Sequence, residues 1–240
     1  DDTVRPNFWR APTNNDEGCA EPFAFAFWKT AGLYARCDNL TAEAKGEFVT
    51  VRANYTLPDG QTLPVDFAID GAGHCDITMT WQGEHAELPE FGLLFPLRRE
   101  LTEVSYLGLG PRETTADRTA GGKMGAWSYN VRQDFAQNTP VYPQECGSRT
   151  GVYRADLTGA IPGICFAGDS MTFSALPYTP HELENARHLY ELPRDDNKTV
   201  VRCALFQRGV GGDNSWGAKP HADDCFAVEK GTSFRFTIQK

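Results

Sequence analysis

Alternation of apolar and polar side chains is the clearest pattern along this chain. Through Val49–Leu57 the odd-numbered positions are apolar or aromatic and the even-numbered positions are polar. The same period of two recurs in Val65–Ile69, Ile77–Trp81 and Phe234–Ile238. Because successive side chains of an extended strand point to opposite faces, this period predicts half-buried β-strands. Turn residues such as Pro58-Asp59-Gly60 separate the first strands and favour consecutive antiparallel pairing.

Helical signal is sparse in comparison. Glu21–Leu33 predicts one short aromatic-rich helix. Thr179-Pro180-His181-Glu182 combines the N-cap threonine, first-turn proline and third-position acid of a capping box, which predicts a brief second helix. Strands do not alternate with helices as a parallel sheet requires. We therefore expect an all-β fold in which residues 1–240 form a single antiparallel β-sandwich domain.

Charge and composition narrow the range of partners. The 240 residues carry a formal net charge of -9, without a run of Lys or Arg. Such a chain repels phosphate backbones and anionic lipid surfaces, so we expect no nucleic acid and no membrane as partners. No stretch approaches the roughly 20 apolar residues that span a bilayer. The first residues, Asp1-Asp2-Thr3, lack an initiator Met, which indicates a piece excised from a longer polypeptide.

The seven cysteines are odd in number, widely spaced and without a C-x-x-C pair. This favours reduced thiols and a cytoplasmic location. Gly108-Leu109-Gly110 has Glu113 in place of the third glycine of a dinucleotide motif, and the glycines at 209–212 lack the Lys-Ser/Thr of a phosphate loop. The five histidines have no zinc-site spacing. We predict no cofactor and no metal for this chain, and composition alone indicates only a soluble all-β domain.

Four unusual motifs span most of the chain: Asn7–Gly18 (NFWRAPTNNDEG), Leu107–Arg118 (LGLGPRETTADR), Pro143–Arg149 (PQECGSR) and Arg208–Trp216 (RGVGGDNSW). In order, they resemble F-x-R-A-P-x-D-N-D-x-G, G-x-G-P-x-E-x-x-x-D-R, P-x-E-N-G-x-R and G-G-D-D/N-S-W. These four patterns are typical of the C-terminal domain (small chain, domain 5) of lacZ-type β-galactosidases in glycoside hydrolase family 2, which the chain therefore resembles. Asn14 replaces a usual Asp, Cys146 replaces an Asn, and the spacer 114–116 also departs from the family pattern.

The resemblance implies a galactose-mutarotase-like antiparallel supersandwich that here lacks its first strands. Such a domain packs against the catalytic TIM barrel of the same polypeptide, and the barrel carries both catalytic glutamates. Family members often use Mg and Na ions, bound on other domains. The resemblance therefore implies a role in hydrolysing terminal β-D-galactosides of the lactose type, while the isolated chain is inactive and contains no catalytic residue. Assembly into a homo-oligomer stays open.

The same resemblance implies which residues of this chain contact a galactoside. Trp216 follows a glycine-rich bend that can turn an indole outward, and an indole plate with one N–H donor suits the face of a pyranose. The predicted substrate-binding residues are Trp216, Asn14, Asn15, Asp16 and Gly18. In the last four we expect the start of a mobile loop with a glycine hinge. The alternatives are a core tryptophan that closes a hairpin, and an ordinary surface turn.

Two other functions remain possible on sequence grounds. One is a stand-alone aldose mutarotase or epimerase, in which His181 and His188 imitate an acid/base pair. The other is a non-catalytic galactoside-binding module. The remaining prominent side chains are assigned to structure. Packing is expected for Trp9, Trp28, Trp81 and Trp127. Buried ion pairs or bonds to backbone carbonyls are expected for Arg10, Arg112 and Glu113.

Overall fold

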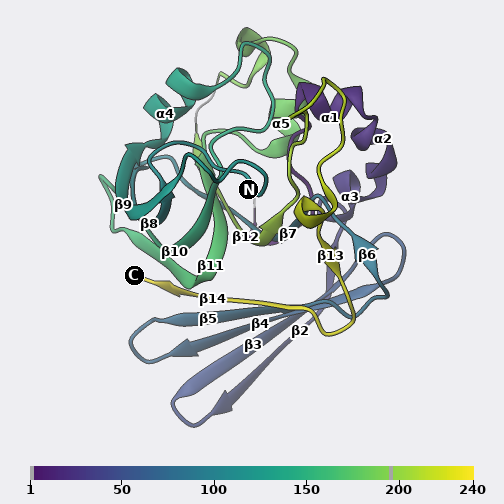
Figure 1. Ribbon diagram of the computed structural model, residues 1–240. Coiled ribbons are helices and arrows are strands. Elements are labelled where there is room, and N and C mark those ends of the chain that lie inside the picture. Colours follow the sequence, from purple (N-terminus) through teal and green to yellow (C-terminus); the bar gives the residue numbers. More distant parts are fainter. Residues whose placement is uncertain (1–2, 195–196) are drawn as a thin grey trace.

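The computed structural model describes residues 3–194 and 197–240 (Figure 1). Asp1 and Asp2, at the start of the sequence, lie outside the described residues. The strands are β1 (Arg5–Asn7), β2 (Arg36–Lys45), β3 (Phe48–Thr56), β4 (Thr62–Asp70), β5 (Cys75–Thr80), β6 (Ala86–Glu87), β7 (Glu90–Arg98), β8 (Leu101–Gly110), β9 (Lys123–Asn130), β10 (Arg149–Gly159), β11 (Ile164–Leu176), β12 (Lys198–Gln207), β13 (Ala227–Val228) and β14 (Ser233–Gln239). The helices are α1 (Asn14–Gly18), α2 (Glu21–Ala24), α3 (Ala26–Ala31), α4 (Val131–Asn138) and α5 (Pro180–Asn185), with 3₁₀ turns η1 (Leu189–Glu191) and η2 (Ala222–Asp224).

One sheet of 12 strands organises the described chain, in the order β1-β7-β12-β11-β14-β5-β4-β3-β2. From β11 a branch leads through β10 and β8 to β9, and β6 and β13 pair separately. The ladders are antiparallel. Strands β8 to β12 curl together in the upper part of Figure 1, and β2 to β5 project below them. The all-β antiparallel architecture predicted from the alternation is confirmed.

Strand β11 connects the curled part to the projecting part. Its residues 172–176 pair with β12, and its residues 165–168 pair with β14 on the same edge. Its other edge pairs with β10, where the register shifts twice between Arg149 and Arg154. Because a register shift bends a strand and increases its twist, the sheet changes direction here. The curled part carries the loops that later form the candidate site.

The predicted strands occur with the predicted faces. Val51 lies opposite Phe67, Phe67 opposite Ile77, and Ile77 opposite Phe236, so one apolar row crosses four strands. The capping box at α5 is also confirmed, because Thr179 and Glu182 bind each other's backbone N–H groups. The single helix expected over 21–33 is wrong: the chain forms α2 and α3, with a break at Phe25.

Aromatic side chains fill the centre of the core. Phe8, Trp28, Trp81 and Phe91 stack edge to face or tilted, with ring centroids 5.6–6.4 Å apart. Such contacts add to the stabilisation that burying the rings provides. The packing role expected for three of the four tryptophans is confirmed, since Trp9 is buried as well. The fourth, Trp127, is only half-buried and packs at the edge of the core.

The projecting end of the sheet is open. All ten residues of β2 are exposed, and among the described strands β2 pairs only with β3. The apolar face continues here past the core, with Leu40, Val49 and Ile69 exposed to 66%, 44% and 39%. An exposed edge strand beside apolar surface favours pairing with further chain.

Candidate functional site

A hollow of about 520 Å³ lies at the loop end of the curled strands. Each of the four sequence motifs contributes to its lining: Asn14 and Asn15 from the first, Glu113 and Arg118 from the second, Gln144, Glu145 and Cys146 from the third, and Val210 to Gly212 with Trp216 from the fourth. The motifs are separated by tens of residues in sequence, and the fold brings them to one place. The hollow is therefore the candidate site.

Trp216 stands at the edge of this hollow and is 73% exposed. The loop that carries it turns at Gly211, Gly212 and Gly217, whose φ angles are +70°, +80° and +80°. Positive φ is costly for other residues, so these glycines make the tight bend that the sequence predicts. The alternative of a core tryptophan is excluded by the exposure. The predicted contact with substrate is not tested by the geometry.

Residues of α1 that the sequence grouped together have different environments. Asn14 is exposed at the hollow, where its backbone N–H donates to Gln144 Oε1 at 3.2 Å. Asn15 points to the Trp216 loop, and its amide is bonded there. Gly18 lies against the indole, because a Cβ on Gly18 would be 3.0 Å from two of its ring atoms. Asp16 is buried and does not line the hollow.

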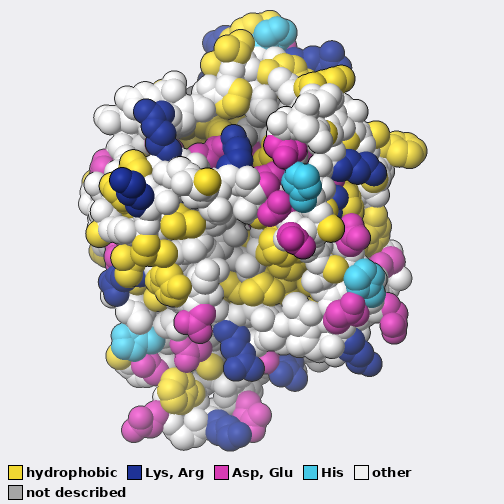
Figure 2. Space-filling view, in the orientation of Figure 1, with side chains coloured by type: hydrophobic (Ala, Val, Ile, Leu, Met, Phe, Trp, Pro, Cys, Tyr) yellow, Lys and Arg dark blue, Asp and Glu magenta, His cyan; other side chains and the backbone are white. Residues whose placement is uncertain are grey.

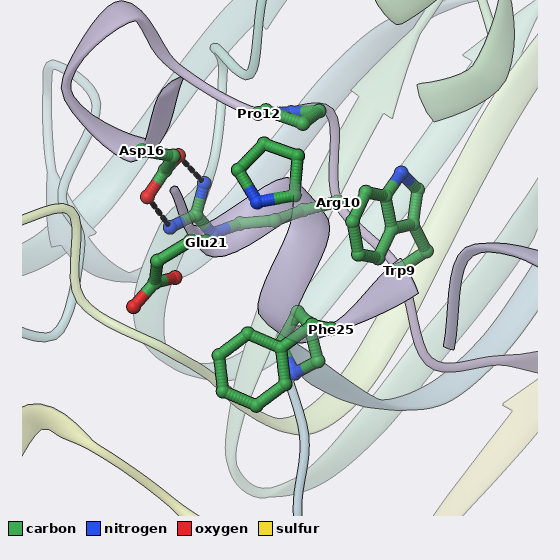
Figure 3. A pocket seen from close by; sticks show the side chains of 8 residues that line it. Trp9, Arg10, Pro12, Asp16, Glu21 and Phe25 are labelled. Atoms are coloured by element: carbon green, nitrogen blue, oxygen red, sulfur yellow. Dashed lines mark hydrogen bonds and ion pairs between the residues drawn. The ribbon is translucent and has the colours of Figure 1, made fainter. Parts of the chain in front are cut away.

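Asp16 instead stabilises helix α1 at the base of the site. Its carboxylate receives two hydrogen bonds from the Arg10 guanidinium, at 2.5 and 2.9 Å, as drawn in Figure 3. It also accepts from the backbone N–H of Thr13 at 2.6 Å, which completes a capping box around α1. Burial opposes the charge on Arg10, but the Asp16 carboxylate raises the guanidinium pKa above its usual range. The buried ion pair expected for Arg10 is confirmed.

Two glutamates that sequence reasoning did not assign to substrate line the hollow. Glu113 accepts from Gly147 N at 2.5 Å and pairs with Arg118 at 2.8 Å, and burial raises the pKa of its carboxyl. Glu145 is buried, and its Oε1 accepts from Arg202, Gln207 and Ser148. Glu145 Oε2 has no protein partner among the described residues. The sequence could have indicated Glu113 and Glu145 only by their positions within the second and third motifs.

Arg202 ties the floor of the hollow to the sheet. Its guanidinium bridges the buried carboxylates of Glu145 and Glu90, with the Glu90 contact at 2.7 Å. Gln207 donates to both carboxylates, at 3.0 and 3.2 Å. Burial raises the pKa of Glu90, and the Arg202 charge opposes that rise. A buried cation between two buried anions gives the floor a rigid arrangement on β7 and β12.

Other predicted contacts are not formed. Arg112 is exposed, so it does not form the buried ion pair that was one of the two contacts expected for it. His181 bonds the Lys29 carbonyl oxygen at 2.7 Å, and burial lowers its pKa, whereas His188 is exposed and pairs with Glu191. The two histidines share no partner in these contacts, and neither lines the hollow.

Residues 3–194 and 197–240 contain no group of three or more His, Cys, Asp or Glu that could hold a metal ion. Within the same residues, no helix combines the length and apolar character that crossing a membrane requires. Acidic and basic side chains are interspersed over the face in Figure 2, without one large cluster of Lys and Arg. The lining of the hollow includes an indole, side-chain amides and the paired carboxylates of Glu113 and Glu145.

Comparison with known proteins decides the family. The model of the family described as "Beta galactosidase small chain" matches residues 2–238. This chain belongs to the β-galactosidase small-chain family. A β-galactosidase of Lactobacillus delbrueckii subsp. bulgaricus is 39% identical over 97% of the chain, but the match covers only 23% of that relative. For a Halalkalibacterium halodurans β-galactosidase the identity is 34%, with 98% of the chain and 24% of the relative covered.

A β-galactosidase small subunit of Latilactobacillus sakei is 33% identical, and the match covers 89% of this chain and 77% of the subunit. This small-chain domain thus corresponds both to a fraction of long β-galactosidases and to most of a separate subunit. Among solved structures, an Escherichia coli K12 protein provisionally described as an aldose 1-epimerase is 13% identical, with a TM-score of 0.36 over 83% of this chain and 67% of that one.

Proposed function

We propose that this small chain is the C-terminal, domain 5 part of a lacZ-type β-galactosidase of glycoside hydrolase family 2. Joined to a catalytic TIM barrel, it contributes to the hydrolysis of terminal β-D-galactosides such as lactose. The support is its match to 23% of the Lactobacillus relative, whose name is β-galactosidase, and to 77% of a relative named as a small subunit. A partner that carries the catalytic glutamates is part of this proposal.

The observation that carries the proposal is the exposed indole of Trp216 at the hollow. An indole offers a broad apolar plate, and the C–H face of a pyranose can stack on it while the hydroxyls reach polar groups at the side. Asn14, exposed at the hollow, is such a group. The hollow thus fits the edge of a galactoside site.

The same hollow does not supply the chemistry of hydrolysis by itself. A glycosidase needs two carboxyl groups on opposite sides of the scissile bond, one of them as a proton donor. Glu113 is bonded to Arg118 and Gly147, and Glu145 is bonded to Arg202. These carboxyls are engaged in structure, so we propose that the isolated chain is inactive and that both catalytic glutamates come from the barrel.

Reconstitution tests the function. The purified chain alone should not hydrolyse a chromogenic β-galactoside, and addition of the catalytic polypeptide should restore turnover. Turnover by the repurified chain alone, in proportion to its amount, would contradict the proposal. Accelerated mutarotation of fresh α-galactose in polarimetry would instead favour an epimerase. Calorimetric binding of galactose by the chain, with no effect on the catalytic polypeptide, would favour a binding module.

We propose further that residues 1–240 fold as one domain. The pairing of β11 with both parts of the sheet supports this. The open edge at β2 favours a homo-oligomer or a strand from the partner. Seven free cysteines support a cytoplasmic, reducing location. Mass spectrometry of protein alkylated during isolation should find all seven cysteines carrying the alkyl group, as reduced thiols would.

A further inference from the structure

The loop that carries Trp216 closes on itself at a narrow neck. At the neck, Gly212 N donates to the carbonyl oxygen of Ala218 at 3.1 Å. Between these two residues lies the tip, with the exposed indole. Three glycines with positive φ give this backbone much conformational freedom. Contacts from outside the loop must therefore define the direction of the indole.

Asn15 binds both sides of that neck. Its Nδ2 donates to the carbonyl oxygen of Val210 and to that of Ala218, each at 2.8 Å. Its Oδ1 accepts from the backbone N–H of Gly217 at 2.7 Å. Both N–H donors and the oxygen of one side-chain amide are thus bonded to three backbone groups of the loop. The amide has no free donor for a sugar hydroxyl.

The helix that presents Asn15 is itself held in place. The Arg10–Asp16 ion pair and the Thr13 cap fix the turn of α1. Arg10 also donates to the carbonyl oxygen of Gly209 at 3.1 Å, at the start of the loop. A rigid base and three bonds at the neck leave the loop little freedom to move relative to α1.

The indole rests directly on the end of α1. A Cβ on Gly18 would come within 3.0 Å of two ring atoms of Trp216 and 2.9 Å of Gly217 Cα. The distance between α1 and the loop therefore decides how the ring is presented to the hollow. On the far side of the loop, Asp117 accepts from Gly211 N at 2.6 Å.

We propose that Asn15 is a positioning residue that fixes the Trp216 indole at the substrate site by closing the neck of its loop. The proposal rests on the proposed function, in which that indole contacts the galactoside. The sequence suggested that Asn15 binds substrate directly. In this proposal Asn15 acts on substrate only through Trp216.

A double-mutant cycle in the intact β-galactosidase tests this role. Asn15→Ala should lower kcat/KM for aryl galactosides and lactose by about tenfold, because small displacements of a binding group cost up to about a hundredfold. In a Trp216→Ala background the same substitution should change kcat/KM less than about twofold, since its effect passes through the missing ring. Asn54→Ala on β3, away from the hollow, is the matched control and should match the wild type.

The outcomes separate the two proposals. If Trp216→Ala leaves kcat/KM unchanged, the proposed function of the indole fails. If Trp216→Ala lowers kcat/KM but Asn15→Ala does not, or if the two losses multiply, the positioning role is overturned and the function stands. If Asn15→Ala does not fold, Asn15→Ser, which keeps a donor and an acceptor, should show a smaller loss of the same kind.

The near-isosteric Asn15→Asp variant adds a readout that a general loss of structure would not produce. It places carboxylate oxygens against the carbonyl oxygens of Val210 and Ala218, where an NH₂ group donated. Repulsion should make this variant worse than Asn15→Ala at pH 7 and raise the new carboxyl's pKa above about 3.9. Activity relative to wild type should therefore recover as the pH falls and the carboxyl becomes a donor. Wild-type kcat/KM in Asn15→Asp at pH 7 would overturn the proposal.

A spectroscopic measurement follows the ring without reference to activity. In intact enzyme labelled with 5-fluorotryptophan, the Trp216 fluorine resonance is identified by its absence from Trp216→Ala. Asn15→Ala should shift or broaden this resonance and leave that of buried Trp81 unchanged. An unchanged Trp216 resonance would show that the ring does not depend on Asn15.

Discussion

Replacing Trp216 with alanine should impair substrate handling and should destabilise the fold much less than replacing a buried tryptophan. The structure supplies a matched comparison, because Trp216 is 73% exposed and Trp81 is 0% exposed. Removing a buried tryptophan side chain costs about 3–5 kcal/mol in unfolding free energy. About a quarter of Trp216 is buried, so the same scale gives roughly 1 kcal/mol for Trp216→Ala. Trp81→Ala should lose the full amount.

The kinetic effect should be larger than the effect on stability. Loss of an aromatic stacking plate costs about 1–3 kcal/mol by analogy with platforms for bases, or roughly ten- to a hundredfold in kcat/KM. Steady-state kinetics of the intact enzyme with nitrophenyl galactoside and lactose measures this loss, and urea unfolding measures stability. If Trp216→Ala instead loses several kcal/mol of stability while the folded fraction keeps wild-type kinetics, the ring packs the fold and does not serve substrate.

Three further predictions concern other parts of the chain. Arg202→Met leaves the buried Glu90 and Glu145 without their cation and should cost about 3–5 kcal/mol in urea unfolding. Because burial raises the pKa of Glu90, that deficit should shrink as the pH falls and the carboxyl is protonated; a deficit independent of pH would contradict this. The Asp213 carboxylate raises the pKa of His221 above 6.5. The stabilisation from this charged pair is therefore fully present just below about pH 6.5 and is lost as the pH rises through the raised pKa of His221. Asp213→Asn should lower the His221 pKa in an NMR titration, and an unchanged value would refute the pairing. Without its catalytic partner the chain should self-associate through the β2 edge, and a strictly monomeric protein in light scattering at high concentration would count against this.

Alternation predicted β3, β4, β5 and β14, where the sheet has one buried face, and did not identify β2, where it has none. Val51 and Ile77 belong to an apolar row that meets the core, so their period of two survives in the sequence. Strand β2 has ten exposed residues, and no burial imposes a period on it. The break at Phe25 was missed because aromatic content does not say which rings go inside: Trp28 is buried and Phe23 is 87% exposed.

The motifs located the candidate site but not the contacts that each residue makes there. Asn14 and Asn15 are neighbours of the same type, yet one is exposed and the other is bonded to a loop about 200 residues later in the sequence. Asp16 was expected at the substrate, but it caps α1 and pairs with Arg10. Side-chain direction on a short helix and partners distant in sequence are decided by tertiary packing, which a single sequence does not display.

The neck closed by Asn15 makes the Trp216 loop a ready scaffold for directed evolution. The neck bonds join Asn15 to backbone atoms of residues 210, 217 and 218, so they do not depend on the side chains at the tip. A library confined to residues 214 and 215 would therefore vary the surface beside the proposed galactoside site and keep both the stem and Trp216. Selection of the proposed enzyme for galactosyl transfer to an alcohol instead of water could begin at these two positions, with the sheet and its buried ion pairs untouched.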